Sequence, residues 1–599
     1  MPRIVQGKEK GKIIFDATDF LSGLHPQFTS STLNSQINIG DRLTSVKNFD
    51  PYRHLGYAAP GQLPTSVATT AQIDTLITDG LMYNQNAYLL TTGKLLKLTS
   101  ITSTPDLSTT SPFPYTITAH SGHSSVVGKS IVQYGHKLSV LLARRLLYVW
   151  ADNTDWDVGT YDFDTTFDDD FMTTVALGDQ SGTVTTNGTT TLAGSGTLFT
   201  QIFEPGDTIY VSGETVRVIA AVASDTSLTV TSAFSTSTGS LTFKSFPSAG
   251  KSYPKPTIVG INDRVYIGDR NYVHEYNGQS TAANGTFSPK VLKIPAGYVI
   301  TCFAKYQNYL VVFAYIESGT SAGTTYFNGD ARAFFWSYNS RDIAFSVGLD
   351  DNYVGCAVEY NGTIACFTQG RTADPTTSNN SKLQIFNGQQ FDVVATFTGN
   401  VPIPAGAEAL GRYLQWNSAG KIYTYGSPFS GVQAALNQTI TNAGGGTSSG
   451  ILKTLSTSFQ VMSAGTTTSG GLEYINFGAT KYTSSAWVVS GLAFPDFGTR
   501  QKGQVERVTI RFQKAATGGR SLTLSVLDGF ANSTTIVSAL TAVTSPDATL
   551  FYEFASNGGY LPQFNAIKCL AEWESGSAAT DAPIIQSVTI EYKIVDISP

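Results

Sequence analysis

Short aromatic strands recur along the chain, and this repeat constrains the fold more than any other feature of the sequence. The segments are LLYVW (146–150), YVHEYNG (272–278), AFFWSYN (333–339), KLQIFNG (382–388), KIYTYG (421–426) and GLEYINFG (471–478). After Tyr276 they are spaced by roughly 40 to 60 residues, the length that four strands and their turns need. The spacing predicts the blades of a β-propeller, with six units between about residues 80 and 490. A string of unrelated small β-sandwiches is the alternative.

The composition favours an all-β, multidomain protein. Of 599 residues only 14% are charged, against roughly 25% in an average soluble domain. The 34 Phe and 29 Tyr indicate large packed cores and exclude a disordered chain. The 57 Gly and the many Ser, Thr and Asn residues are typical of sheet surfaces and tight turns. We find no segment with the pattern of an amphipathic helix longer than about three turns.

Residues 178–245 interrupt the repeat, because the interval from Trp150 to Tyr272 is too long for one blade. Within them TIYVSGETVRVIAAV alternates almost strictly between apolar and polar residues, and glycine-containing turns recur. We therefore predict a small β-barrel or sandwich inserted into a loop of a propeller-like domain that spans residues 76–177 and 246–490. Insertions at exposed loop tips are well tolerated.

The two ends of the chain differ from this region. Residues 1–75 have no sustained period and carry Pro51, Pro60 and Pro64, so we expect an extended N-terminal arm along another domain or a neighbouring subunit. Residues 491–599 alternate cleanly, for example in QVERVTIRFQK and IIQSVTIEYKIVD. They predict a C-terminal β-sandwich of the jelly-roll or carbohydrate-binding type.

The register of one hairpin predicts how two of the cysteines lie. In VGCAVEYNGTIACF the Asn361-Gly362 pair is a strong signal for a two-residue turn. Pairing outward from it sets Ala357 opposite Cys366 and Cys356 opposite Phe367, so the two thiols point to opposite faces. We expect no disulfide and no shared metal between them. The expected state of all cysteines is a buried reduced thiol: Cys302, Cys356, Cys366 and Cys569.

An aspartate-rich run, ADNTDWDVGTYDFDTTFDDDF, is the one place where the sequence suggests a cation. Hard cations bind several carboxylate oxygens, and Asp155, Asp157 and Asp162 are the candidate Ca²⁺ ligands. The spacing matches an EF-type loop only in part, because no Glu stands at the closing position. The simpler interpretation is a solvated acidic loop between a blade and the inserted domain. No other cofactor is suggested.

Signals for catalysis are weak, and we expect the chain not to be an enzyme and to have no catalytic residues. Gly128-Lys129-Ser130 resembles a phosphate-binding loop, but five residues rather than four separate it from Gly122. The following IVQYGHKLSVLL predicts strands and not the helix such a loop requires. The six histidines lack metal-ligand spacing, His120 and His123 included. Two carboxylates for glycoside hydrolysis could still meet in the fold, although the S-x-D-x-G-x-x-W box of propeller glycosidases is missing.

Charge and hydropathy exclude two kinds of partner. The net charge is −6, and basic residues form no stripe with interleaved aromatics, so no nucleic-acid groove is expected. The apolar run Tyr309–Ile316 is too short to span a bilayer, and the N-terminus lacks the apolar stretch of a secretory signal. We expect a chain made in a cytosol that does not insert into membranes. Its low charge would let DNA pass without sequence recognition.

Three segments resemble structural proteins of tailed bacteriophages. GTVTTNGTTTLAGSGTLFT with GDTIYVSGETVRVIAAVASDTSLTV is similar to a small β module of such proteins. DFLSGLHP and NFDPYRHLGYAAPG are similar to arms that precede a propeller-like region in tail nozzle or tail tubular proteins. The resemblance implies a virion tail protein, assembled in the host cytoplasm as a cyclic homo-oligomer, a hexamer by expectation. Other tail proteins, an adaptor and fibres, would be its partners.

The expected function is therefore a structural part of a phage tail, a nozzle or tubular ring that contributes to the DNA-ejection channel and to an attachment platform. Low charge fits this role, because copies of such a surface repel each other little and can hydrogen-bond through Ser, Thr and Asn rims. A receptor-binding or fibre-attachment protein with a glycan-binding sandwich is the alternative. A propeller glycosidase or depolymerase is the third possibility.

Overall fold

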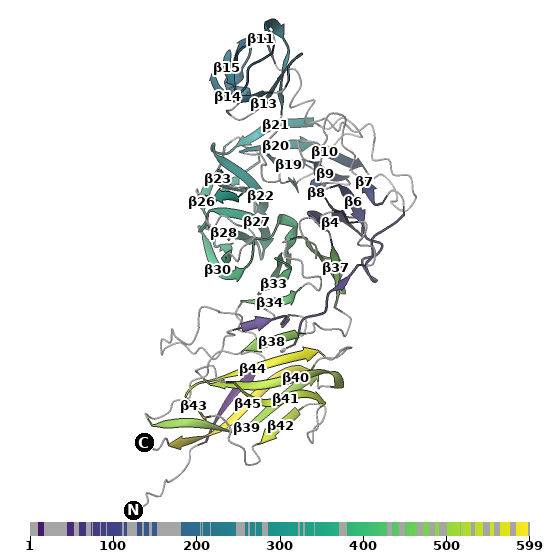
Figure 1. Cartoon of the computed structure of the whole chain (residues 1–599), viewed down its shortest axis with the longest axis vertical. Coiled ribbons are helices and arrows are strands. Elements are labelled where there is room, and N and C mark those ends of the chain that lie inside the picture. Colours follow the sequence, from purple (N-terminus) through teal and green to yellow (C-terminus); the bar gives the residue numbers. More distant parts are fainter. Residues whose placement is uncertain are drawn as a thin grey trace, which may run out of the picture.

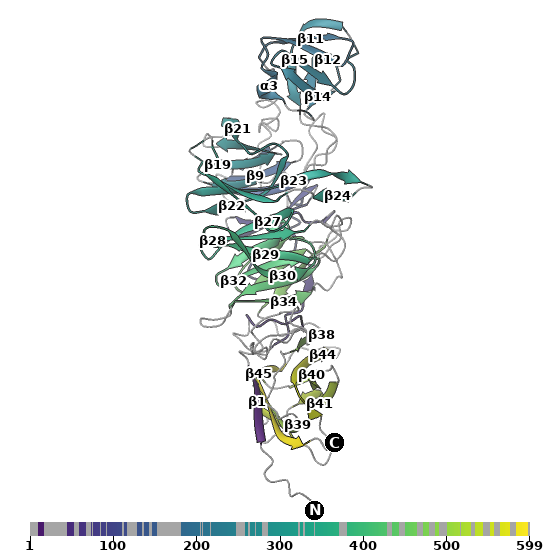
Figure 2. The same ribbon diagram turned by 90° about the vertical axis from the view of Figure 1, so that its left-hand side faces the viewer.

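The structure is a computed structural model in which three β-rich parts follow one another along the long axis of the chain (Figure 1, Figure 2). A small barrel lies at one end, a propeller in the middle and a sandwich at the other end. The structure describes residues 10–16, 45–52, 59–67, 73–116, 128–151, 181–246, 258–277, 286–370, 380–427, 434–441, 450–463, 471–477, 485–489, 500–528, 533–542, 551–555, 563–575 and 583–596, several of these ranges with gaps of one to four residues. The predicted fold class is confirmed: an all-β chain with a propeller-like core, an inserted β domain and a C-terminal sandwich.

The propeller consists of antiparallel sheets that follow one another in the sequence, which we number as blades 1 to 7. Blade 1 holds β4 (Asp79–Tyr83), β5 (Asn86–Leu90), β6 (Lys94–Lys97) and β7 (Tyr115–Thr116); blade 2 holds β8 (Gly128–Tyr134), β9 (Lys137–Leu142) and β10 (Leu147–Ala151); blade 3 holds β18 (Ile258–Ile261), β19 (Arg264–Asp269), β20 (Tyr272–Asn277) and β21 (Thr286–Lys293). Blade 4 holds β22 (Tyr298–Tyr306), β23 (Tyr309–Ser321), β25 (Arg332–Trp336) and β26 (Phe345–Gly348), with β24 (Thr324–Phe327) beside β23.

The remaining blades follow the same strand order. Blade 5 holds β27 (Tyr353–Tyr360), β28 (Thr363–Gln369), β29 (Asn380–Phe386) and β30 (Phe391–Thr398); blade 6 holds β31 (Ala407–Leu410), β32 (Tyr413–Ser418), β33 (Lys421–Gly426) and β34 (Ala435–Thr441). Blade 7 holds β35 (Leu452–Thr454), β36 (Phe459–Ser463), β37 (Leu472–Asn476) and, from the N-terminal segment, β3 (Thr65–Ser66). The outer strand of the last blade thus comes from residues that precede the first blade.

The described part of the chain has seven blades, so the expected six units were one too few. Each of the six aromatic segments contributes the third strand of a blade, from β10 to β37. The uncounted unit is blade 1, whose third strand, β6, has the sequence KLLK and no aromatic residue. There Leu95 and Leu96, both 1% exposed, provide the buried apolar surface instead.

Contacts between neighbouring first strands arrange the blades as a ring. β4 contacts β8, β8 contacts β18, and the series continues through β22, β27 and β31 to β35. Apolar clusters fill the spaces between blades, as Phe313, Phe335 and Phe386 do between blades 4 and 5. Blade 7 packs back on blade 1, where Leu89 and Val461 belong to one buried cluster. Burial of this apolar area is the main favourable term for the ring.

The inserted domain is a barrel. Its sheet has the strand order β16-β11-β12-β15-β14-β13-β17. β16 and β17 are separated by one residue only, so the two ends of the sheet are the same stretch of chain and the barrel closes. Phe199, Phe203 and Phe243 form the centre of its core. The elements are β11 (Thr183–Asn187), β12 (Thr191–Ser195), α3 (Phe199–Ile202), β13 (Thr208–Val211), β14 (Arg217–Ser224), β15 (Ser227–Val230), β16 (Ser237–Leu241) and β17 (Phe243–Phe246).

The C-terminal sandwich is completed by strands from the N-terminal segment. One sheet has the order β1-β45-β39-β42 with β43 beside β39, and the other has the order β2-β38-β44-β40-β41. Phe15 from β1 and Val46 from β2 lie in the common core with Trp573. The strands are β1 (Lys10–Asp16), β2 (Ser45–Lys47), β38 (Ser485–Val489), β39 (Gln501–Lys514), β40 (Thr517–Asp528), β41 (Ser533–Ala542), β42 (Phe551–Ala555), β43 (Gln563–Phe564), β44 (Ile567–Ser575) and β45 (Ile584–Asp596).

Two expected boundaries differ from this arrangement. β1, β2 and β3 lie along other domains, as expected for the arm over residues 1–75, but they do so as paired strands that belong to the sandwich and to blade 7. β38 falls before the expected start of the sandwich at residue 491, yet it pairs with β44 in that domain. Pairing with a strand far away in the sequence leaves no periodic signal in a short segment, so neither feature was visible in the sequence.

The hairpin register predicted from the Asn361-Gly362 turn is confirmed. Cys356 pairs with Phe367 and Ala357 with Cys366, and both turn residues have positive φ, 49° and 74°. Cys356 packs toward blade 6 and Cys366 toward blade 4, on opposite faces of the sheet. The strands predicted after Gly128-Lys129-Ser130 are also confirmed as β8 and β9.

We predict that none of the four thiols reacts in the native protein. All four are free and buried, and burial raises the pKa of Cys302 and Cys569 to about 12, so the reactive thiolate is scarce at neutral pH. Labelling with a thiol reagent should modify no cysteine in the native chain and all four in denaturant. Rapid native labelling of Cys356 or Cys366 would contradict the packing of blade 5.

Candidate functional site

A short 3₁₀ turn contacts strands from several blades of the propeller. η4 (Pro404–Gly406) lies in the connection from blade 5 to blade 6, yet it contacts β4 of blade 1, β27 of blade 5 and β35 of blade 7. Its neighbour Ile403 packs against the cluster between blades 7 and 1. Blades 1 and 5 are as far apart as two members of a seven-membered ring can be. Because both blades contact the same turn, we infer that η4 reaches across the middle of the ring.

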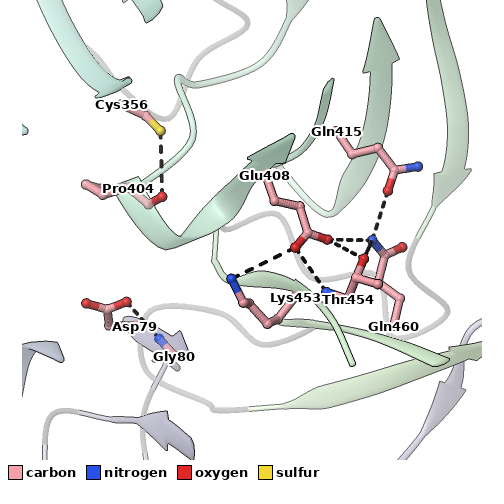
Figure 3. Close-up of polar contacts among 9 residues, drawn as sticks. All are labelled: Asp79, Gly80, Cys356, Pro404, Glu408, Gln415, Lys453, Thr454 and Gln460. Carbon is pink, nitrogen blue, oxygen red and sulfur yellow. Dashed lines mark hydrogen bonds and ion pairs between the residues drawn. The ribbon is translucent and has the colours of Figure 1, made fainter. Parts of the chain in front are cut away.

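Glu408 on β31 lies beside this turn and connects blade 6 to blade 7 (Figure 3). Its Oε1 accepts hydrogen bonds from Thr454 Oγ1 (2.5 Å) and from Gln460 Nε2 (3.0 Å). Its Oε2 accepts one from the Thr454 backbone N–H (3.1 Å), and Lys453 Nζ lies 4.0 Å away. The side chain is only 9% exposed. Charge-assisted hydrogen bonds of this kind are stronger than those between neutral groups.

Asp79, the first residue of β4, makes an equivalent connection between blades 1 and 2. Its Oδ2 accepts hydrogen bonds from Ser130 Oγ (2.8 Å) and the Ile131 backbone N–H (2.9 Å). Its Oδ1 accepts one from the Gly80 backbone N–H (2.7 Å). Both carboxylates near η4 are therefore occupied by donors of the protein itself. A general base needs a free lone pair directed at substrate, so this arrangement suits a structural connection between blades.

A row of polar side chains continues from Glu408 across the whole of blade 6. Cross-strand pairs join Glu408 to Gln415, Gln415 to Thr424, and Thr424 to Asn437. Gln460 of blade 7 donates to Gln415 Oε1 (2.9 Å), and Gln415 donates to Thr424 Oγ1 (3.3 Å). All of these side chains except Glu408 are 3% exposed or less. Among the described residues, the buried apolar cluster that these two blades share is small: Ile422, Ile440, Leu452, Met462 and Ile475.

The row ends on the N-terminal segment at Tyr52. Asn437 Nδ2 donates to Tyr52 Oη (3.2 Å), and that hydroxyl donates to the Ala435 carbonyl (3.0 Å). Burial raises the pKa of Tyr52 well above its usual value near 10. The hydroxyl is therefore neutral and remains a donor throughout the neutral pH range.

A second polar connection lies between blades 4 and 5. Lys382 Nζ donates to Asp350 Oδ2 (2.8 Å) and Asp351 Oδ1 (3.1 Å), and Thr368 Oγ1 donates to Asp351 Oδ2 (2.8 Å). Burial lowers the pKa of Lys382, but the hydrogen bonds to the two carboxylates outweigh it and the pKa is raised overall. The Lys382 side chain is 27% exposed and that of Asp350 57%, so solvent screens the ion pair between them and its contribution to stability is small.

The residues proposed from the sequence as a site are not brought together. Asp155, Asp157 and Asp162, the candidate Ca²⁺ ligands, lie outside the described residues, and so do His120 and His123. Within the part that the structure describes, no group of three His, Cys, Asp or Glu side chains could hold a metal ion. The same residues include no helix long and apolar enough to cross a membrane.

The polar row was not predicted from the sequence, although the sequence contains a signal for it. In YLQWNS, KIYTYG and ALNQTIT polar residues recur on one face of three consecutive strands. Such alternation is the usual mark of a solvent-facing surface. The polar face of blade 6 is buried because blade 7, the last blade of the ring, packs against it. No local sequence pattern indicates that a blade will pack there.

Comparison with known proteins finds no matching family model and no matching curated protein. Three solved structures align over most of the chain. The computationally designed Ika8 protein is 12% identical, covering 69% of this chain and all of that chain, with a TM-score of 0.33. YCF48 bound to D1 peptide is 8% identical; the alignment covers 72% of this chain and all of that chain, with a TM-score of 0.36. The Dos1 propeller is 8% identical; the alignment covers 69% of this chain and 94% of that chain, with a TM-score of 0.34. At such scores, the fold assignment depends on the sheet topology described above.

We predict that replacing Glu408 by Ala destabilises the propeller. The change removes the acceptor of the half-buried Thr454 hydroxyl and backbone N–H, and one of the acceptors of the buried Gln460 amide, which costs roughly 1–3 kcal/mol. The urea midpoint, followed by the fluorescence of the buried Trp416 in blade 6, should fall accordingly. Glu359 on β27 is exposed, so the matched Glu359→Ala change should leave the midpoint nearly unchanged. Equal effects of the two changes would refute a structural role of Glu408.

We also predict a loss of stability in alkali that Tyr52→Phe reduces. Burial raises the pKa of Tyr423 to about 12 and that of Tyr52 further. Unfolded tyrosine has a pKa of about 10. Because the folded-state pKa is higher, each buried tyrosine makes its full contribution to the free energy of unfolding below about pH 10, and this contribution falls as the pH rises further. The slope of unfolding free energy against pH above 10 should be smaller for Tyr52→Phe than for the wild type. An unchanged slope would show that Tyr52 is not buried.

Proposed function

We propose that the protein is a structural component of a bacteriophage tail, a nozzle or tubular ring built from several copies around the path of ejected DNA. The observation that carries this proposal is the strand pairing between the N-terminal segment and the C-terminal part of the chain. β1 and β2 complete the C-terminal sandwich, and β3 completes the last blade. The result is one elongated building block of three β domains (Figure 1). The resemblance of the arm and the inserted segment to phage tail proteins supports the same role.

The position of η4 bears on where DNA would pass. The turn contacts first strands from both sides of the ring, so the axis of a single propeller offers no route for a duplex. In the proposed role the lumen lies between copies, and the propellers form its wall. Rings of identical subunits form through heterologous interfaces that close after a full rotation.

The low charge of the chain suits such an assembly. With 14% charged residues, electrostatic repulsion between copies is small, and uncharged polar side chains can hydrogen-bond across subunit interfaces. A wall of this kind also presents few cations to the phosphate backbone, so a passing duplex is not retained by counterion release.

The mass of the assembled protein tests this proposal. We predict that mass photometry of the purified chain detects the mass of a closed ring, which we expect to be a hexamer. A stable trimer would instead favour a receptor-binding or fibre-attachment protein, and a monomer at all concentrations would contradict the proposal. Release of reducing sugar from a host polysaccharide would favour an enzyme.

The place of the protein requires a separate measurement. An affinity label on this chain, imaged on intact phage particles by electron microscopy, should appear at the tail. Label on the capsid or on no particle would exclude the proposed role even if the purified chain forms a ring.

A further inference from the structure

The interface between blades 6 and 7 differs from the other described interfaces of the propeller. Its apolar cluster has five fully buried members, whereas the cluster between blades 4 and 5 has fifteen. The rest of the interface is polar: Glu408, Gln415, Asn417, Thr424, Asn437, Gln460 and Glu473 are all buried. We call this interface the polar seam. It gains less from the hydrophobic effect than its neighbours.

Several buried oxygen atoms in the polar seam have no hydrogen-bond partner. They are Gln460 Oε1, Asn417 Oδ1 and Asn437 Oδ1, together with Ser463 Oγ. Their residues are at most 1% exposed. A buried polar atom without a partner disfavours the closed state, because water would satisfy it once the two blades separate. Among the interfaces whose apolar clusters the structure describes, between blades 3 and 7 and between blades 7 and 1, we therefore expect opening of the ring to cost least at the polar seam.

Residues 45–52 and 59–67 of the N-terminal segment contact the outer strands on both sides of this seam. On blade 6, the Phe49 backbone N–H donates to the Gln438 carbonyl (3.0 Å), and Thr441 Oγ1 donates to Asn48 Oδ1 (2.7 Å). Tyr52 Oη donates to the Ala435 carbonyl (3.0 Å) on the same strand, β34. The segment is thus fixed along the outer strand of blade 6.

The same segment then binds blade 7. Thr65 and Ser66 pair with Tyr474 and Glu473 of β37, and the Val67 backbone N–H donates to the Leu472 carbonyl (2.9 Å). At its other end, β2 pairs with β38 in the sandwich. Residues 45–52 and 59–67 therefore contact the sandwich and both sides of the polar seam.

We propose that residues 45–52 and 59–67 form a latch that holds the polar seam closed, and that the propeller opens at this seam when the latch is released. The latch begins in the sandwich, so any partner that displaces β2 loosens the seam between blades 6 and 7. This inference concerns the chain itself and does not depend on the proposed tail function.

Hydrogen exchange of the full chain, followed by mass spectrometry, tests the latch. The double change Asn48→Ala and Tyr52→Phe removes the side-chain contacts of the latch to Thr441 and Ala435. Exchange in β31–β37 should rise at least about tenfold, with β22–β30 unchanged. The matched control is Tyr360→Phe, which removes a hydroxyl that donates to the Arg412 carbonyl between blades 5 and 6. It should not accelerate exchange in β35–β37.

A reversible cross-link gives the opposite test, and the reduced form of the same variant is its control. Thr65 and Tyr474 are cross-strand partners, so Thr65→Cys with Tyr474→Cys would bind the latch to blade 7 covalently. Oxidation should slow exchange in β35–β37 severalfold, and reduction should restore it. Uniform acceleration of all blades by the double change, or no effect of the cross-link, would overturn the proposal.

Discussion

Antiparallel pairing between the N-terminal segment and strands from the last quarter of the chain is the interaction on which the three-part structure depends. β1 pairs with β45, β2 with β38 and β3 with β37. These contacts join residues several hundred positions apart, so the loop that they close is the propeller itself. Loop-closure entropy grows only slowly with length, and the buried Phe15, Val46 and Phe49 offset it. The paired N-terminal and C-terminal strands thus close the loop of chain that forms the ring.

The aromatic repeat could be predicted because it follows from packing on both faces of a third strand. In β25, Phe335 faces the cluster with blade 5, while Phe334 and Trp336 face the cluster with blade 3. A strand between two neighbouring blades needs large side chains at successive positions, and the sequence displays them as a contiguous aromatic run. Blade 1 was not predicted because its third strand, β6, buries two leucines and has no aromatic residue.

The polar seam and the N-terminal strands could not be predicted for a different physical reason. A two-residue strand such as Thr65–Ser66 has no periodicity, and its partner lies some four hundred residues away. The buried row that includes Gln415 and Thr424 looks like a solvent-facing strand pattern until another blade covers it. Local patterns report how one strand is buried, whereas these features depend on which strands meet when the ring closes.

The position of η4 changes what the composition implies about assembly. Because η4 contacts β4, β27 and β35, a turn of the chain lies between first strands on different sides of the ring. The low charge therefore matters on the outer surfaces, where copies would meet and where a lumen between them would lie in the proposed ring. Those are also the surfaces crossed by the N-terminal segment, from β2 over blade 6 to β37. A contact between copies at that place would act directly on the segment that joins the sandwich to the propeller.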